Sequence, residues 1–257
     1  MKKILIIPEI DNIFECVELS KKYDLGFEYN DFFWPDVLDD DKKISEIISE
    51  YKKYDLPEFT TLHGAFFDVI PFSVDSKIRE ISKNRILKSI WVAKEIGAKA
   101  VIFHTNYNPF LNSKSYIDEW IEKNVQFWSE ILKSHSDIDI YLENMFDTSP
   151  DIMEALSEKL CEFNNYGICF DYAHASLSKV NPEEWVKRLG KYIKHVHIND
   201  NDGISDLHLA WGDGKLDRQE LYACYEKYIE NATVLVEVVN NDNKIKSIDV
   251  LKNEKFF

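Results

Sequence analysis

The stretch Tyr166–Asp200, YGICFDYAHASLSKVNPEEWVKRLGKYIKHVHIND, contains one complete strand–helix–strand unit. Two apolar runs, Tyr166–Asp171 and Ile193–Asn199, alternate only partly, which is typical of parallel strands that are covered on both faces. Between them, Asn181 and Pro182 have the pattern of a helix cap followed by a first-turn proline. Both runs end in side chains that can bind metal, so this stretch predicts both a fold and the position of its chemistry.

The same strand–helix rhythm runs along the whole chain of 257 residues. Eight apolar, β-branched runs are the candidate strands: Lys3–Ile7, Leu25–Tyr29, Phe59–His63, Ala100–His104, Ile138–Glu143, Tyr166–Asp171, Ile193–Asn199 and Thr233–Val239. Eight such units in about 250 residues favour a closed parallel barrel. We therefore expect one α/β domain over residues 1–257, a (β/α)8 TIM barrel. An open, doubly wound sheet is the rival fold, but the sequence lacks the Gly-rich turn that such a sheet uses for dinucleotides.

Further helix boundaries follow from capping residues. Ser149 and Pro150 have the spacing of a cap followed by a first-turn proline, and Asp217–Glu220 has that of a capping box. The segment Asp75–Ile96 carries a long helical stripe that ends at Gly97, a predicted C-cap.

A net charge of −15 and a hydrophobic fraction of 45% describe an acidic protein with enough apolar residues for a large core. Its field repels polyanions, so nucleic-acid binding is disfavoured unless bound cations locally reverse the sign. The four cysteines form no CxxC motif and are predicted to be buried, reduced thiols of a cytoplasmic protein. The N-terminal MKKILIIPEID is too short in apolar residues for a signal peptide, and no window approaches the ~18 apolar residues of a membrane span.

Nine side chains that can bind metal lie at or just past the C-terminal ends of apolar runs. They are His63, His104, Glu143, Asp171, His174, His197, Asp206, His208 and Glu237. A (β/α)8 barrel brings the C-terminal ends of all its strands to one face, and that face carries the chemistry. A lone histidine at a strand end is usually structural, but several at matching ends predict a shared site for zinc, manganese or iron.

Two motifs supply ligands in pairs. In FDYAHA, Asp171 and His174 are three residues apart where the strand ends, and the alternative role of Asp171 is to cap the following helix. In HVHIND, His195 and His197 lie on one face of the strand. We assign His197 to the metal and His195 to the packed interior, with Asn199–Asp200 at the rim in supporting roles.

The following loop contributes Asp206 and His208, and Gly212–Gly214 is predicted to be the tight turn that folds it back over the site. The alternative for this pair is a solvated loop. Glu143 and Glu237 end the fifth and eighth candidate strands, on opposite sides of the pocket. Paired carboxylates across a metal suit proton transfer at a sugar carbon, because one can remove the proton and the other can return it.

The roles of other residues near the mouth are left open or have two interpretations. Glu28, in GFEYN, reaches the mouth and is left unassigned, and Asn144 is assigned to its loop. Five aromatic side chains in the rim loops either stack on a sugar ring or a base or pack beneath the loops: Phe66, Phe67, Tyr107, Phe110 and Trp211.

The ordered set of motifs resembles the xylose isomerase-like TIM-barrel superfamily, which includes sugar phosphate isomerases and epimerases and the endonuclease IV type of apurinic endonuclease. The motifs are LHGAF, FHTNYNP, LEN, CFDYAHA, HVHINDNDG, DLHLAWGDGKLD and LVEVV. For the endonuclease branch, the resemblance implies that all nine side chains hold three metals. Glu143 would bridge two of them, Asp171 and His197 would share one of these, and the third would be bound by His174, Asp206 and His208.

For the sugar-epimerase branch, the resemblance implies a single ion with the ligands Glu143, Asp171, His197 and Glu237. The two glutamates would be the acid/base pair, and His174 would contact the substrate. The chain departs from both branches. Its first strand, LIIPEID, lacks the His-Val-Ser type of ending of the endonucleases, and no Arg/Lys-rich rim loop is present to grip DNA. Gly203 stands where ketose epimerases have an arginine, and Lys215 and Arg218 are the only nearby candidates for a phosphate clamp.

We therefore expect an enzyme, a metal-dependent isomerase or epimerase of a sugar or sugar phosphate. Its catalytic residues would be Glu143 and Glu237, and its substrate contacts His174 and Lys215. Zinc is the preferred ion, in up to three copies, with manganese as the alternative. The second hypothesis is a zinc-dependent phosphodiesterase acting on abasic DNA, and the third is a barrel that binds a small ligand without turnover. A homodimer is left open.

Overall fold

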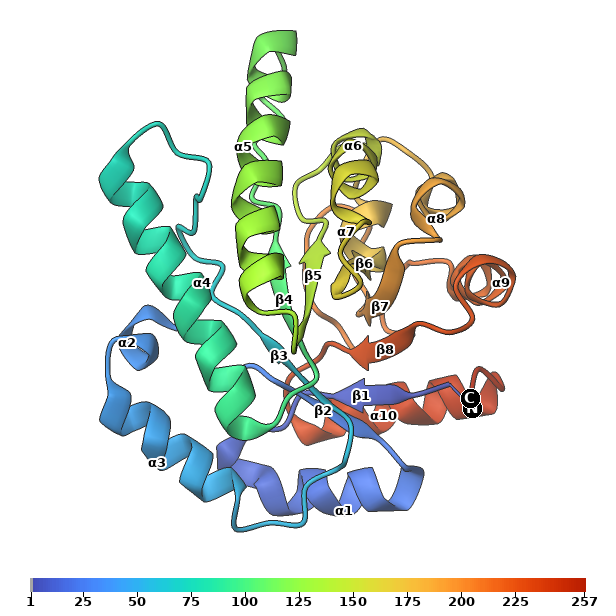
Figure 1. Ribbon diagram of the computed structural model, residues 1–257. Helices are drawn as coiled ribbons and strands as arrows, with labels where there is room; N and C mark the ends of the chain where they lie inside the picture. The colour runs from blue at the N-terminus through green and yellow to red at the C-terminus, as the bar shows by residue number, and fades with distance from the viewer. Residues whose placement is uncertain (1) are drawn as a thin grey trace.

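The computed structural model describes residues 2–257 and confirms the closed barrel of eight parallel strands, with β1 to β8 in sequence order (Figure 1). The strands are β1 (Ile4–Ile6), β2 (Gly26–Tyr29), β3 (Thr60–His63), β4 (Ala100–His104), β5 (Asp139–Glu143), β6 (Tyr166–Asp171), β7 (Ile193–Ile198) and β8 (Thr233–Val236). The last strand pairs in parallel with the first, through Leu5 and Leu235 among others, and so closes the barrel.

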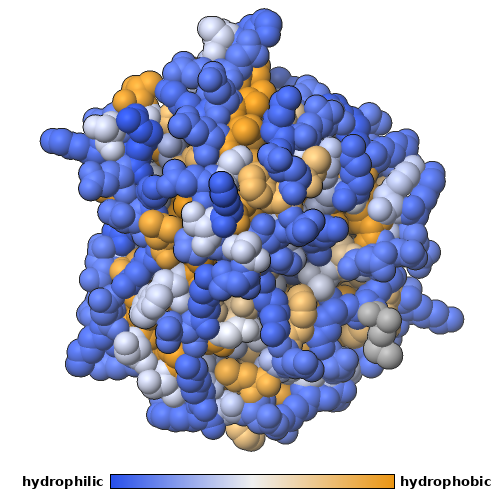
Figure 2. Space-filling view, viewed as in Figure 1, coloured by the Kyte–Doolittle hydropathy of each residue, from blue (hydrophilic) through white to orange (hydrophobic). Residues whose placement is uncertain are grey.

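Helices form a ring outside the strands, as Figure 1 shows. They are η1 (Ile10–Asn12), α1 (Ile13–Tyr23), α2 (Pro35–Leu38), α3 (Asp41–Tyr51), α4 (Ser76–Ile96), α5 (Lys114–Ser134), α6 (Asp151–Leu160), α7 (Tyr172–Ser176), α8 (Pro182–Leu189), α9 (Arg218–Tyr228) and α10 (Asn241–Asn253). No helix within residues 2–257 is both long enough and apolar enough to cross a membrane. The face in Figure 2 is mostly hydrophilic, with hydrophobic patches between the polar side chains.

Most of the predicted helix caps are present. Asn181 caps α8 by accepting a hydrogen bond from Glu183 N at 2.8 Å, and Gly97 ends α4 with a left-handed φ of 84°. The prediction for α6 was wrong, because the helix begins at Asp151 and Ser149 Oγ donates to the Asp151 carboxylate instead of capping the backbone.

Two further expectations need correction. The last strand ends at Val236, not Val239, because Val238 N turns back to donate to Val236 O at 3.0 Å. Glu237 therefore lies just after the strand, where its backbone N still donates to Ile198 O of β7 at 2.8 Å. The second correction concerns the thiols: Cys161, at the C-terminal end of α6, is exposed, whereas the other three cysteines are buried.

The core has an outer and an inner part. A large apolar cluster fills the space between the strands and the helices. Two small apolar clusters of inward-facing residues are separate from the large one. One of these clusters consists of Leu5, Ile7 and Leu235. Because polar side chains divide these inner clusters, the barrel interior is already polar below its mouth. Glu28 and His195, which belong to this polar part, are fully buried.

Candidate metal centre

The C-terminal mouth of the barrel encloses a cavity of 250 Å³. Seven of the nine predicted ligands line it: His63, His104, Glu143, His174, Asp206, His208 and Glu237. The other two, Asp171 and His197, are fully buried at the ends of β6 and β7 beside the same cluster. Residues that are distant in the sequence are thus gathered at one place by the parallel strand ends.

The first ligand group consists of His63, His104 and Glu143, at the ends of three neighbouring strands. His63 Nε2 lies 3.2 Å from His104 Nε2, and Glu143 Oε2 lies 3.7 and 3.5 Å from these two atoms. Two neutral imidazole nitrogens facing each other cannot satisfy one another when both present lone pairs. A cation between them and the carboxylate would allow both nitrogens to present lone pairs to it.

The second group consists of Glu143, Asp171 and His197. His197 Nδ1 lies 3.4 Å from Glu143 Oε2 and 3.5 Å from Glu237 Oε2. Asp171 uses one oxygen to accept from His174 N, at 2.6 Å, and so does cap α7. Its other oxygen, Oδ2, is buried without a hydrogen-bond partner among residues 2–257, so capping α7 leaves one oxygen of Asp171 available as a ligand.

The third group consists of His174, Asp206 and His208. Asp206 Oδ2 lies 3.3 Å from His174 Nε2 and 3.2 Å from His208 Nε2. The loop that brings Asp206 and His208 to the mouth is tied down by Asp200, whose carboxylate accepts from the backbone N of Gly212 at 3.0 Å and of Leu216 at 3.1 Å. The predicted return turn at Gly212–Gly214 is therefore present, and Gly212 has a φ of 98°.

Hydrogen bonds to the backbone orient three of the histidines. The Nδ1 atoms of His63, His174 and His208 lie 2.9, 2.8 and 3.2 Å from the carbonyl oxygens of Gly64, Asn144 and Glu237, respectively. Because a carbonyl only accepts, each Nδ1 carries the hydrogen, which leaves each Nε2 as the nitrogen available to a metal. This outer hydrogen bond is what a metal-binding histidine usually makes.

Buried polar atoms without a hydrogen-bond partner point to cations. Among residues 2–257, they include Glu143 Oε2, Asp171 Oδ2 and His197 Nδ1. Unpaired buried groups of this kind are costly. Because all three belong to the ligand groups, and because imidazole nitrogens and carboxylate oxygens suit zinc or manganese, the residues fit a divalent metal.

The electrostatics of the cluster agree with this fit. Burial raises the pKa of the Asp171 carboxyl to about 7, although the positive charge of His174 opposes it. Burial lowers the pKa of His104 to about 3. Burial also acts against His208, yet the Glu237 and Asp206 carboxylates raise its pKa to about 10. The protein by itself therefore holds protons among these ligands, and a cation binding there would displace them.

Glu28, which the sequence left unassigned, is part of the site's support. It is fully buried within β2, and its carboxylate oxygens lie 3.1 Å from His195 Nε2 and 3.1 Å from His197 Nε2. Thr61 Oγ1 also donates to it, at 2.7 Å. The available signal was a charged residue inside an apolar run, which is costly to bury without a partner.

His195 lies in the packed interior, as predicted. Its Nδ1 atom is 2.6 Å from Thr233 Oγ1, and its ring stacks on Tyr141. Asn144 does more than satisfy its own loop. It accepts from Asp171 N and donates to Asp171 O, both at 2.9 Å, and thereby fixes the ends of β5 and β6 to each other.

The two basic residues that the sequence offers for binding phosphate, Lys215 and Arg218, lie away from the ligand groups. The Lys215 side chain is exposed and lines neither mouth cavity, while its backbone N donates to Asn201 O at 2.8 Å. Arg218 binds the Glu254 carboxylate, at 2.7 Å between Nη2 and Oε1. The structure therefore brings neither Lys215 nor Arg218 to the candidate metal ligands, and the substrate contact of Lys215 stays a prediction.

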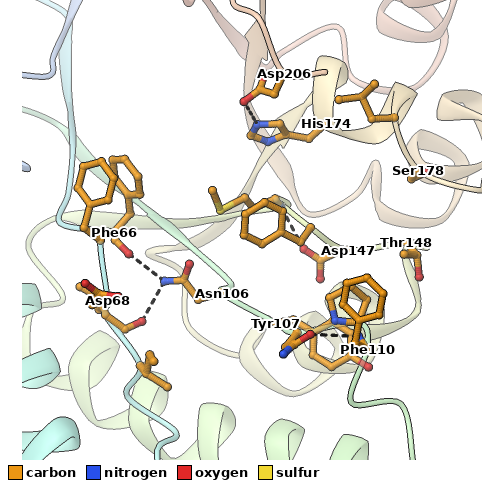
Figure 3. A pocket seen from close by; sticks show the side chains of 18 residues that line it. Phe66, Asp68, Asn106, Tyr107, Phe110, Asp147, Thr148, His174, Ser178 and Asp206 are labelled. Atoms are coloured by element: carbon orange, nitrogen blue, oxygen red, sulfur yellow. Dashed lines mark hydrogen bonds and ion pairs between the residues drawn. The ribbon is translucent and has the colours of Figure 1, made fainter. Parts of the chain in front are cut away.

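A second cavity, of 930 Å³, adjoins the ligand groups (Figure 3). Four of the five aromatic residues expected at the rim line it: Phe66, Phe67, Tyr107 and Phe110. The fifth, Trp211, is fully buried and donates through Nε1 to Tyr222 Oη at 2.9 Å, so it packs beneath the loops.

Comparison with known proteins places the chain in a family. A family model described as a xylose isomerase-like TIM barrel matches residues 19–253. The uncharacterized protein MJ1311 of Methanocaldococcus jannaschii is 31% identical over 203 residues, which cover 74% of this chain and 68% of that protein.

Two named enzymes and one solved structure are also similar. A probable endonuclease 4 of Mycobacterium leprae is 25% identical over 67% of this chain and 70% of its own length. Fructoselysine 3-epimerase of Shigella flexneri is 28% identical over 57% of this chain and 55% of its own length. The crystal structure of a D-tagatose 3-epimerase-like protein superimposes with a TM-score of 0.76 at 25% identity, covering 100% of both chains.

Proposed function

Because this chain belongs to the xylose isomerase-like TIM-barrel family, we propose that it is a metal-dependent isomerase or epimerase of a sugar or sugar phosphate. The observation that carries the proposal is that two glutamate carboxylates lie beside the same nitrogen of one histidine ring. Glu143 Oε2 and Glu237 Oε2 lie 3.4 and 3.5 Å from His197 Nδ1, and both glutamates line the same cavity. The similarity to fructoselysine 3-epimerase and to the D-tagatose 3-epimerase-like protein supports a sugar substrate.

The chain's own residues suit proton transfer at a carbon next to a carbonyl. One of Glu143 and Glu237 removes the proton as a general base, and the other returns it as a general acid. Return to the opposite face inverts the carbon. Four side chains would hold the divalent ion: Glu143, Asp171, His197 and Glu237. When bound, the ion supplies Lewis-acid polarisation of the substrate carbonyl.

We assign His174 to substrate contact. It lines both the 250 Å³ and the 930 Å³ cavities, and its ring is fixed by Asn144 O through Nδ1. A fixed imidazole between the two spaces can hold a sugar hydroxyl in one orientation, which lowers the entropic part of the barrier.

A second candidate is a zinc-dependent phosphodiesterase that acts on abasic DNA. It is favoured by the three ligand groups, which together hold eight of the nine predicted ligands; Glu143 belongs to two of them. The similarity to a probable endonuclease 4 also supports it. The net charge of −15 weighs against it, because phosphate contacts normally come from Lys and Arg.

Metal stoichiometry separates the candidates. We would measure it by elemental analysis of the purified protein, before and after reloading with zinc or manganese. About one ion per chain supports the four-ligand sugar site, whereas about three zinc ions favour the phosphodiesterase. Each result is followed by its assay: deuterium incorporation from D2O into a panel of sugars and sugar phosphates, or incision of an abasic duplex at low salt that is lost on chelation.

Glu237→Gln tests the acid/base assignment. General acid–base catalysis contributes roughly 10²- to 10⁴-fold, so turnover on an identified sugar should fall by that order. Full turnover in this variant would disprove the proton-transfer role. A barrel that binds a sugar tightly but exchanges no deuterium and incises no DNA would instead support ligand binding without turnover.

A further inference from the structure

The 930 Å³ cavity continues outward from the metal ligands. It shares four lining residues with the 250 Å³ cavity: Phe66, Met145, His174 and Asp206. Figure 3 shows His174 and Asp206 at one end of the space and Tyr107 and Phe110 at the other. A molecule whose reacting part lies at the metal ligands can therefore extend into the larger cavity.

We propose that this cavity is a subsite for an apolar, uncharged substituent of the substrate, so that the enzyme acts on an aryl or alkyl derivative of a sugar. The inference rests on the proposed function and names its substrate class. A volume of 930 Å³ lies in the range of small-molecule binding sites, about 300–1,000 Å³, and exceeds what the 250 Å³ cavity alone provides.

Exposed aromatic side chains at its edge support an apolar occupant. Phe110 is 91% exposed and Phe146 is 61% exposed, and both line the cavity together with Phe67, which is 41% exposed. Clustered apolar side chains left in water are unusual on a protein surface and mark binding sites. Covering these rings with an apolar group removes their surface from water.

The charge of the lining disfavours an anionic substituent. No lysine or arginine occurs among the lining residues, all of which lie within the described part of the chain. Asp68, Asp147 and Asp206 contribute carboxylates instead. A phosphate would meet negative charge here without a cation to bind it, so this cavity disfavours sugar phosphates.

Asp147 adds a specific polar contact. Its side chain is almost fully buried, and Oδ2 accepts from Thr105 Oγ1 at 2.8 Å and from Met145 N at 3.0 Å. The other oxygen, Oδ1, is buried without a hydrogen-bond partner among residues 2–257. Because the residue lines the cavity, a hydroxyl or amide donor on the ligand can satisfy this atom.

The test uses the neutral fluorophore N-phenyl-1-naphthylamine on the full-length, metal-loaded protein. We expect saturable binding at one site per chain. The double variant Phe110→Ala/Phe146→Ala should weaken binding roughly tenfold, because it removes two aromatic contacts. Phe14→Ala is the matched control, since Phe14 on α1 is exposed to the same 61% as Phe146 but lies outside this cavity. All three positions are exposed, so circular dichroism should show an unchanged fold.

Displacement then links the cavity to sugars. Phenyl β-D-glucopyranoside should displace the fluorophore at a concentration at least tenfold lower than D-glucose or glucose 6-phosphate. The proposal is overturned if no saturable binding occurs, if Phe14→Ala weakens binding as much as the double variant, or if glucose 6-phosphate competes as well as the phenyl glycoside. A dimer in sedimentation that excludes the fluorophore would assign the face to a second copy of the chain and would also overturn it.

The two proposals fail separately. Fluorophore binding needs no turnover. If the fluorophore binds as expected but no sugar is converted, the subsite proposal stands and the proposed isomerase or epimerase function is refuted. Conversion of free sugars or sugar phosphates with no preference for aryl derivatives would support the proposed function and refute the subsite.

Discussion

Glu28 Oε1 lies 3.1 Å from His197 Nε2, across the interior of the barrel from β2 to β7. The negative charge at this distance favours the hydrogen on Nε2, which leaves Nδ1, beside Glu143 and Glu237, as the nitrogen available to a cation. The carboxylate thus selects the ring nitrogen that can bind a cation, although it is not itself near enough to the mouth to line either cavity. Such supporting contacts tune metal affinity.

Glu28→Gln should weaken metal binding by roughly 10- to 100-fold, because the amide removes the negative charge that orients His197 and supports its basicity. Competition with a fluorescent chelator measures this affinity, and circular dichroism reports the fold. The control is Glu18→Gln, an exposed glutamate on α1. Wild-type affinity in the Glu28 variant would show that His197 is oriented by packing alone.

Removal of bound metal should lower thermal stability. Without a cation, Glu143 Oε2 and Asp171 Oδ2 remain buried and unpaired. Metal present at 100 times its Kd stabilises the folded state by about 2.7 kcal/mol, and a domain of this size changes its Tm by roughly 2–4 °C per kcal/mol. Excess chelator should therefore lower the Tm by about 5–10 °C, as measured by calorimetry, and zinc should restore it. The Tm of Asp171→Ala should fall less on addition of chelator. A fall equal to that of the wild type would contradict the proposed role of Asp171 as a metal ligand.

Gly214→Ala should disturb the loop that carries Asp206 and His208. A Cβ at Gly214 would overlap the Asn201 carbonyl oxygen and the Asp200 carboxylate, which hold the loop in place. We expect a destabilisation of about 1–3 kcal/mol. In the three-metal alternative, the variant should also lose about one ion per chain. Elemental analysis after reloading measures the ions, with the exposed Lys215→Ala in the same turn as control. Undiminished metal content would mean that the Asp206–His208 pair binds no ion or that the loop adapts.

Asp147→Asn should stabilise the protein at neutral pH. Burial raises the pKa of the Asp147 carboxyl above its usual 3.8, so the folded state disfavours the charged form. In the wild type, the free-energy cost of burying the charged carboxylate is therefore absent at pH values below 3.8. This cost grows as the pH rises from 3.8 through the raised pKa of the folded state. An asparagine can keep both hydrogen bonds to Oδ2, from Thr105 and Met145.

Urea denaturation across pH checks this prediction. The stability of the variant relative to wild type should increase from acid to neutral pH. The exposed Asp118→Asn on α5 serves as control, with no such gain expected. A difference between Asp147→Asn and wild type that stays constant with pH would show that the carboxylate is as well accommodated as the carboxylic acid.

Much of the fold was predictable because the strand and helix signals are local. Apolar runs gave all eight strands, with ends displaced by at most a few residues. The end of the last strand was misplaced, since Val238 and Val239 are as apolar as the strand itself and only the turn at Val238 ends the pairing. Ser149 was misread as a cap because its hydroxyl has another acceptor, the Asp151 carboxylate, within reach.

The candidate site was predictable in part for the same reason. Once parallel strands close a barrel, a side chain at a strand end must lie at the mouth, so His63 and His104 meet although 41 residues separate them. The sequence could not decide whether Asp171 caps a helix or serves as a ligand. A carboxylate has two oxygens, and in the structure one caps α7 while the other is left without a hydrogen-bond partner in the described part of the chain. The contact of Glu28 with His197 joins strands on different sides of the interior, and no local pattern encodes it.

The sequence by itself therefore determined the strand order, the barrel and the set of metal-competent side chains at its mouth, since these depend on periodicity and on the geometry of parallel strands. The tertiary structure decided which ring nitrogen each histidine presents, how the side chains divide into groups, and where the 930 Å³ cavity lies. These depend on distances of a few ångströms between loops and strands that are far apart in the chain. Such distances result from the packing of the whole molecule, not from any one segment.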